Sequence, residues 1–186
     1  MLEAVSSSRP RRRRLALAAG AAGAAAVIGV TGLTVSANAA PGTPAAVASK
    51  NVTVDNRSLS IDAAVKAAQA ALKAAEQGGH RVTVVVLDRA GTVQVELKGD
   101  GAGPQTAESA HRKAFTAVSF GQPTSVLAGR VTGGGATLRD IPGTLFLAGG
   151  VPITVDGQPI AAIGVGGAPS GDLDEQYATA GAATLR

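Results

Sequence analysis

The chain has 186 residues, of which 45% are hydrophobic and 16% are charged, a composition typical of a globular protein. Cysteine is absent, which excludes disulfides, catalytic thiolates, zinc sites with thiolate ligands and cysteine-bound iron–sulfur clusters. Aromatic residues make up only 2%, so small and branched aliphatic side chains must fill the core. The two histidines, His80 and His111, are too few for a zinc site built on three histidines.

Residues 1–39 have the pattern of an export signal. Five arginines precede an apolar stretch over 15–35, and Ala37-Asn38-Ala39 matches a small-x-small cleavage site. The run Arg12-Arg13-Arg14-Leu15 is compatible with twin-arginine export. The apolar stretch is also about long enough to cross a bilayer, so a retained membrane anchor is the alternative. Cleavage after Ala39 predicts a secreted protein, extracellular or associated with the cell surface.

The formal net charge of +4 belongs to this leader. It holds five of the 17 basic residues and one of the 13 acidic residues, which leaves 12 of each in the rest of the chain. A neutral domain lacks the basic surface on which nucleic-acid binding depends, so we expect no nucleic-acid partner.

Residues 40–57 contain prolines and small residues and are predicted to form a flexible lead-in. A helix is expected from an N-cap at Ser60 to Gly78-Gly79, because apolar residues recur at helical spacing between them. A hairpin follows, with a central strand over 81–88 and an alternating strand over 92–98.

A second helix is predicted from Pro104 to Phe120, and a short one from 122 to about 131. The glycine run at 133–135 and Pro142-Gly143 bracket a long irregular segment. Two strands, 151–155 and 160–165, are expected to join at an Asp156-Gly157 turn, and a last helix spans 172–185, with Asp172 and Glu175 as a capping pair. This order predicts a single α+β domain over 58–186, with a mostly antiparallel sheet flanked by helices.

Several of these segments together resemble the GlcG/HbpS-like haem-binding family. They are the strand at 82–88 with Gly91, Asp100-Gly101-Ala102, His111-Arg112-Lys113-Ala114, Gly149-Gly150-Val151-Pro152-Ile153, Ile163-Gly164-Val165 and Asp174-Glu175. The resemblance runs from about Ser60 to Leu185 in the family's order. One departure is Gly166, where many members carry a serine. The leader and the run from Gly166 to Glu175 resemble the secreted haem-binding HbpS branch.

The resemblance implies haem and iron as cofactors and a homo-oligomer of octamer type. In that branch it also implies redox sensing through a two-component system, by contact with a membrane sensor kinase. Some members are associated with haem degradation, so a haem-degrading or other small-molecule-transforming enzyme of the same fold is the alternative function. An interaction module without a cofactor is a third hypothesis.

With haem as the expected ligand, few side chains can hold the iron. Haem iron usually takes His, Cys, Met or Tyr, which leaves His80, His111, Tyr177 or a weak hydroxyl ligand. We take His111 and Thr144 as the first candidates. Residues 141–147 are a candidate pocket wall, because apolar side chains there flank Gly143 and the Thr144 hydroxyl; an ordinary buried strand is the alternative.

Carboxylates supply the candidates for binding iron without haem. Glu108 and His111 stand three apart on one helix face, the spacing used in carboxylate-bridged iron bundles, and a second copy would have to complete such a site. The alternative is a surface pair between Glu108 and Arg112. Asp172, Asp174 and Glu175 could bind a cation or could favour a helix N-terminus.

Alanines on the second helix, at positions 107, 110, 114 and 117, form a smooth stripe. Because small residues permit close approach between copies, we expect this stripe to support a stable homo-oligomer larger than a dimer. No set of nucleophile, base and orienting residue can be identified from the spacing of the serines and histidines.

Overall fold

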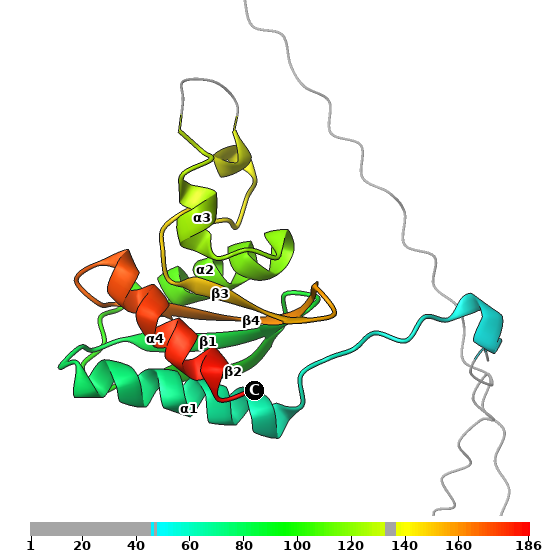
Figure 1. The fold of residues 1–186 in the computed structure, drawn as a ribbon, viewed down its shortest axis with the longest axis horizontal. Helices are drawn as coiled ribbons and strands as arrows, with labels where there is room; N and C mark the ends of the chain where they lie inside the picture. The colour runs from blue at the N-terminus through cyan, green and yellow to red at the C-terminus, as the bar shows by residue number, and fades with distance from the viewer. Residues whose placement is uncertain (1–45, 47, 133–136) are drawn as a thin grey trace, which may run out of the picture. The chain divides into compact units, whose positions relative to one another are not determined.

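A four-stranded antiparallel sheet separates two layers of helices in the computed structural model, which describes residues 46, 48–132 and 137–186 (Figure 1). The strands are β1 (Thr83–Asp88), β2 (Val93–Lys98), β3 (Gly150–Val155) and β4 (Gln158–Gly166), in the order β2-β1-β4-β3. Helices α1 (Ile61–Gln77) and α4 (Gly171–Ala183) cover one face, and α2 (Thr106–Phe120) covers the other (Figure 1). The short helix α3 (Thr124–Ala128) follows α2, and the predicted α+β class is confirmed.

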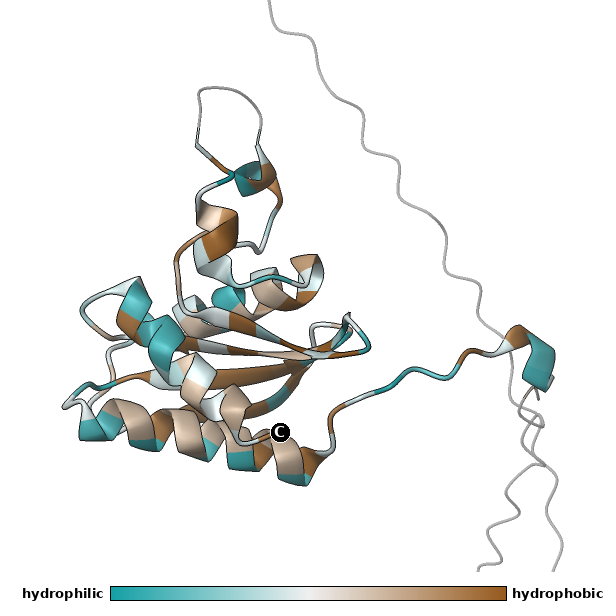
Figure 2. Cartoon of the chain, viewed as in Figure 1, coloured by the Kyte–Doolittle hydropathy of each residue, from teal (hydrophilic) through white to brown (hydrophobic). Residues whose placement is uncertain are grey.

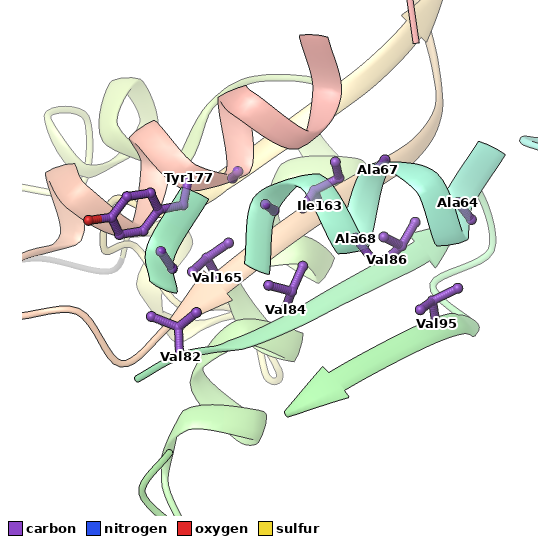
Figure 3. Close-up of a cluster of buried hydrophobic side chains, with 13 residues drawn as sticks. Ala64, Ala67, Ala68, Val82, Val84, Val86, Val95, Ile163, Val165 and Tyr177 are labelled. Carbon is purple, nitrogen blue, oxygen red and sulfur yellow. The ribbon is translucent and has the colours of Figure 1, made fainter. Parts of the chain in front are cut away.

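The prediction of a central first strand is confirmed. β1 pairs with β2 on one side and with β4 on the other, and its valines are buried on both faces. Val84 and Val86 face α1 and α4, in the cluster that Figure 3 shows, whereas Val85 and Leu87 belong to the cluster under α2. Figure 2 shows that the sheet is mostly hydrophobic, as a layer between helices must be.

Helix α2 lies unusually close to β4 because the strand has glycines beneath it. A Cβ atom on Gly164 would stand 2.0 Å from the Ala110 carbonyl oxygen, and one on Gly166 would stand 2.8 Å from the Thr106 carbonyl oxygen. A serine at position 166 would therefore require α2 to shift here. The alanine stripe faces this contact: Ala110, Ala114 and Ala117 are fully buried against the chain's own sheet. Our expectation that this stripe packs between copies is therefore wrong.

Element boundaries follow local chemistry. Ser60 caps α1 as predicted, and its hydroxyl accepts a hydrogen bond from the Ala63 N–H. α2 begins at Thr106 rather than at Pro104, which lies in the turn before it, and α3 ends at Ala128 rather than near 131. The Asp156-Gly157 turn is confirmed: both residues have positive φ, 52° and 76°, as a tight hairpin requires.

The last helix departs from its predicted cap. α4 begins at Gly171, and its N-cap is Ser170, whose hydroxyl accepts from the Leu173 N–H. Asp172 and Glu175 are therefore not a capping pair. Asp172 lies in the first turn, where a negative charge is favourable, and Glu175 bonds to other elements described below.

Several predictions fall outside these elements. The leader at 1–39 and the glycine run at 133–135 lie outside the described residues. In the lead-in, a single 3-10 turn spans Lys50–Val52, and a second one, Leu138–Asp140, interrupts the segment predicted to be irregular. None of the described helices is both long enough and apolar enough to cross a membrane.

Candidate functional site

A shallow groove of about 280 Å³ lies on the side of α2 that faces away from the sheet. It is lined by Glu108, His111, Arg112 and Phe115 from α2 and by Gly143 from the loop before β3. The groove exists because the opposite side of the helix carries the alanines buried on the sheet. The structure therefore brings His111 to the loop that contains Thr144.

Two turns, each with a glycine, pack against the ring of Phe115. Gly143 has φ of 82°, and a Cβ there would stand 3.6 Å from the Phe115 ring. Gly91, in the β1–β2 turn, also has φ of 82°, and its Cβ would stand 3.1 Å from the same ring. Both positions need the left-handed backbone that glycine adopts without strain. Phe115 is half-buried and serves as an apolar floor for the groove.

His111 and Thr144, our two candidates for holding haem iron, differ in their hydrogen bonding. His111 is half-buried and has no hydrogen-bond partner among the described residues. Thr144 is also half-buried, and its hydroxyl donates to the Ile141 carbonyl oxygen at 2.7 Å. That bond uses the hydroxyl proton and leaves oxygen lone pairs free. The assignment of either residue as a ligand stays a prediction.

The carboxylate of Glu108 is 2.5 Å from Arg112 Nη2, so the predicted i,i+4 surface pair is present. Both side chains are exposed, and such pairs contribute little to stability. The proposed iron ligands Glu108 and His111 line the same groove, but the described part of the chain contains no cluster of three His, Asp or Glu residues that could hold a metal ion. One chain thus supplies two ligands, and that prediction still requires a second copy.

His80 and Tyr177, the other candidates for haem ligation, lie on the opposite face of the sheet. His80 Nδ1 is 2.6 Å from the Tyr177 hydroxyl oxygen, and Tyr177 is buried in the cluster under α1 and α4 (Figure 3). His80 is half-buried by this contact. These two side chains satisfy each other away from the groove.

Residues 141–149 form a loop rather than a strand. Phe146 is buried with Phe120, Leu127 and Val131 in a small separate cluster, and Leu147 is exposed. Of the candidate pocket wall at 141–147, Gly143 lines the groove and the apolar residues 145–147 do not.

A buried ion pair joins the two helix layers around the beginning of β3. Lys113 Nζ on α2 is 2.6 Å from Asp174 Oδ2 on α4 and donates to the Val165 carbonyl oxygen at 3.1 Å. Asp174 also accepts from the Ala168 N–H. Burial raises the pKa of the Asp174 carboxyl despite the opposing effect of Lys113. Lys113 is thus not an exposed cation available to haem propionates.

Glu175 connects α4, α3 and the loop before β3. Its carboxylate accepts from the Gly149 N–H and the Ser125 N–H, each at 3.1 Å, and from the Ser125 hydroxyl. Of the three side chains proposed above to bind a cation, Asp174 and Glu175 therefore have structural partners. Sequence reasoning missed these roles, although a lysine on the same helix face as Ala110, Ala114 and Ala117 does indicate a buried partner.

Comparisons with known proteins agree with this architecture. A family model described as "Haem degrading protein HbpS-like" matches residues 59–183. A crystal structure of HbpS is 59% identical, with a TM-score of 0.73, and the match covers 76% of this chain and 99% of that one. A doubly substituted Streptomyces reticuli HbpS is 58% identical, with a TM-score of 0.72 and coverage of 77% and 97%.

A more distant match is a PduOC:heme complex, 27% identical with a TM-score of 0.63, covering 68% of this chain and 94% of that one. No curated protein sequence matches the chain. The family model spans most of the chain and the identity to HbpS extends over almost all of that structure, so the chain belongs to the HbpS-like family of haem-degrading proteins.

Proposed function

We propose that this chain is an exported haem- and iron-binding protein that senses haem or oxidative stress and modulates a membrane sensor kinase of a two-component system. The observation that carries the haem-binding part is the groove, where an unpaired imidazole and an aromatic floor lie beside a glycine turn. Membership of the HbpS-like family and the likeness to a relative solved with haem support it. Export, sensing, the kinase and an octamer-like assembly rest on the leader pattern and the family resemblance.

The residues of the groove fit one side of a haem. Gly143 and Phe115 offer a surface without polar side chains, and burial of porphyrin area at roughly 25 cal/mol per Å² can supply much of the affinity. A groove of about 280 Å³ is open to solvent along one side, so a second copy of the chain would cover the other face of the ring. The donors available are an imidazole and a hydroxyl, which suits weak or single-sided ligation.

Each groove residue then has a role. His111 or Thr144 would ligate the iron, Phe115 would contact the ring, and Arg112 could turn from Glu108 toward a propionate. Haem held here would supply redox chemistry at its iron. The chain's own contribution is to hold the ring and leave a position on that iron open, which favours a peroxide sensor over a sealed carrier.

The alternative function is a haem-degrading enzyme, and the description of the matching family model favours it. Glu108 and Arg112 at the rim of the groove are the charged groups that could orient the ring. This function differs from sensing in requiring turnover of the tetrapyrrole.

Haem titration followed by the Soret band tests binding. His111→Ala should alter the band if the imidazole is axial, and Thr144→Ala should do so if the hydroxyl faces the iron. Ser119→Ala, an exposed site on the same helix outside the groove, is the matched control. Wild-type protein that leaves the haem spectrum unchanged would refute the proposal, and unchanged spectra in both variants would exclude both ligands.

Product analysis separates the two functions. The haem-loaded protein is incubated with ascorbate as electron donor in air-saturated buffer, which supplies the dioxygen that ring opening consumes, and the tetrapyrroles are separated by chromatography. Intact haem after many hours supports the sensor, whereas stoichiometric loss of haem with a linear tetrapyrrole product supports the enzyme.

A further inference from the structure

Among the described residues, one side-chain hydrogen bond joins α2 to the loop whose Gly143 forms a wall of the groove. Within the loop, a turn closes on itself through the Thr144 N–H and hydroxyl, both of which donate to the Ile141 carbonyl oxygen. Neither bond fixes the turn to the rest of the protein. The attachment comes one residue later, where the Leu145 N–H donates to the Thr116 hydroxyl oxygen at 2.8 Å.

Thr116 is well placed to fix the distance between α2 and the loop that contains Gly143. It is fully buried, and its hydroxyl proton is donated to the Arg112 carbonyl oxygen one helical turn earlier, at 2.8 Å. The direction of that bond forces the oxygen lone pairs toward the loop, because a threonine hydroxyl has one proton to give. The hydroxyl thus links the backbone of α2, beside the groove residue Arg112, to the loop two residues after Gly143.

The end of the loop makes its hydrogen bonds several residues after the turn at 141–144. The Gly149 N–H donates to Glu175, and the Gly150 N–H donates to the buried Thr124 hydroxyl at 2.8 Å. These bonds fix the beginning of β3. Before the turn at 141–144, the Arg139 guanidinium donates to the Val131 carbonyl oxygen at 2.7 Å, and after it Phe146 packs with Phe120. The bond to Thr116 is the hydrogen bond to α2 that lies nearest the turn. Hydrogen bonds to buried groups are costly to lose, because the orphaned N–H stays out of water.

We propose that Thr116 is a positioning residue for the groove, setting the separation between the Gly143 turn and the face of α2 that carries His111. This inference rests on the proposed haem-binding function, and it names the residue on which the shape of that site depends. Thr116 does not line the groove itself and would act through Leu145.

The test compares two isosteric substitutions at buried threonines. Thr116→Val removes the hydroxyl that holds the loop. Thr83→Val removes an equally buried hydroxyl, which is 2.7 Å from the Thr106 hydroxyl and outside the groove. We expect the haem Kd to rise about tenfold or more in Thr116→Val and less than about twofold in Thr83→Val. Thr116→Ser retains the hydroxyl and should restore affinity.

A second measurement does not depend on haem. Hydrogen exchange of the peptide around Leu145 should accelerate in Thr116→Val and stay unchanged in Thr83→Val. If wild-type protein binds haem and both valine variants bind it equally well, the positioning role is refuted and the proposed function stands. If exchange accelerates without loss of affinity, the loop is held by Thr116 but the site does not need it, which also refutes the inference. If wild-type protein binds no haem, the proposed function itself fails.

Discussion

Removing the buried cation Lys113 gives the sharpest test of the electrostatics of this fold. In Lys113→Met the apolar stem is retained, but Asp174 loses its partner while 4% of its side chain remains exposed. The folded protein must then either bury an unpaired carboxylate or protonate it. Protonation of Asp174 sets an upper limit on the loss of folding free energy. With an unfolded pKa of about 4, neutralising the carboxyl at pH 7 costs about 4 kcal/mol. We therefore expect a loss of about 3–4 kcal/mol at pH 7, within the range seen when one partner of a buried pair is removed.

The raised pKa of Asp174 also determines how the penalty of Lys113→Met changes with pH. Burial already raises the pKa of Asp174 in the folded state, so its contribution to stability is present below the unfolded pKa and is lost as the pH rises through the folded pKa. Without Lys113 that pKa rises further. The penalty of Lys113→Met should then shrink by about 1.4 kcal/mol for each pH unit below 7, until the pH reaches the folded pKa that Asp174 has in the wild type.

Urea denaturation followed by far-ultraviolet circular dichroism, at about pH 5 and about pH 8, measures both quantities. Lys73→Met, at an exposed site on α1, is the control and should change stability by less than about 0.5 kcal/mol. Lys113→Met/Asp174→Asn should regain stability and lose the pH dependence, because no titratable group remains buried there. A penalty below about 1 kcal/mol, or one that is independent of pH, would refute this account of the pair.

Three further predictions concern packing, the His80–Tyr177 pair and the leader. Gly164→Ala should lower the free energy of unfolding by about 2–3 kcal/mol in urea denaturation, because its Cβ would overlap backbone atoms of α2. Gly129→Ala is the control and should be nearly neutral, because a Cβ there has room. Equal effects of the two substitutions would contradict the close contact. Tyr177→Phe should cost about 1 kcal/mol, and a double-mutant cycle with His80→Gln should show coupling; additive effects would show that the bond contributes nothing. N-terminal sequencing of exported protein should begin at Ala40, and an intact leader in the membrane fraction would favour the anchor.

The sequence predicted the elements whose pattern is local. The buried β1, the Ser60 cap and the Asp156-Gly157 turn each follow from a few consecutive residues, and each is confirmed. The alternation predicted for β2 holds over 95–98, but Val93 is exposed where the register with β1 shifts. The α+β class then follows from their order. Boundaries moved by a few residues where a neighbouring cap competed, as Ser170 does at α4.

Contacts across the fold were not predictable in the same way. An alanine stripe shows that something approaches α2 closely but not what, and we assigned it to another copy when it packs on Gly164. The partner of Lys113 is 61 residues away on the other helix layer. For the groove, His111 could be identified by its chemistry, but Thr116 could not, because its role depends on where a distant loop lies.

Alanine fills much of the interior of this fold, so little side-chain conformational entropy is lost when the interior packs. Its fully buried positions include Ala64, Ala67, Ala68, Ala71, Ala75, Ala110, Ala114, Ala117, Ala161, Ala162 and Ala178. Alanine has no rotamers to lose on folding, so each of these residues is ordered at almost no side-chain entropy cost. Truncating such a residue removes one methyl group, while enlarging it displaces a helix from the sheet. This interior should therefore tolerate few enlarging substitutions, the reverse of a leucine-rich core, where exchanges among large residues of similar volume survive.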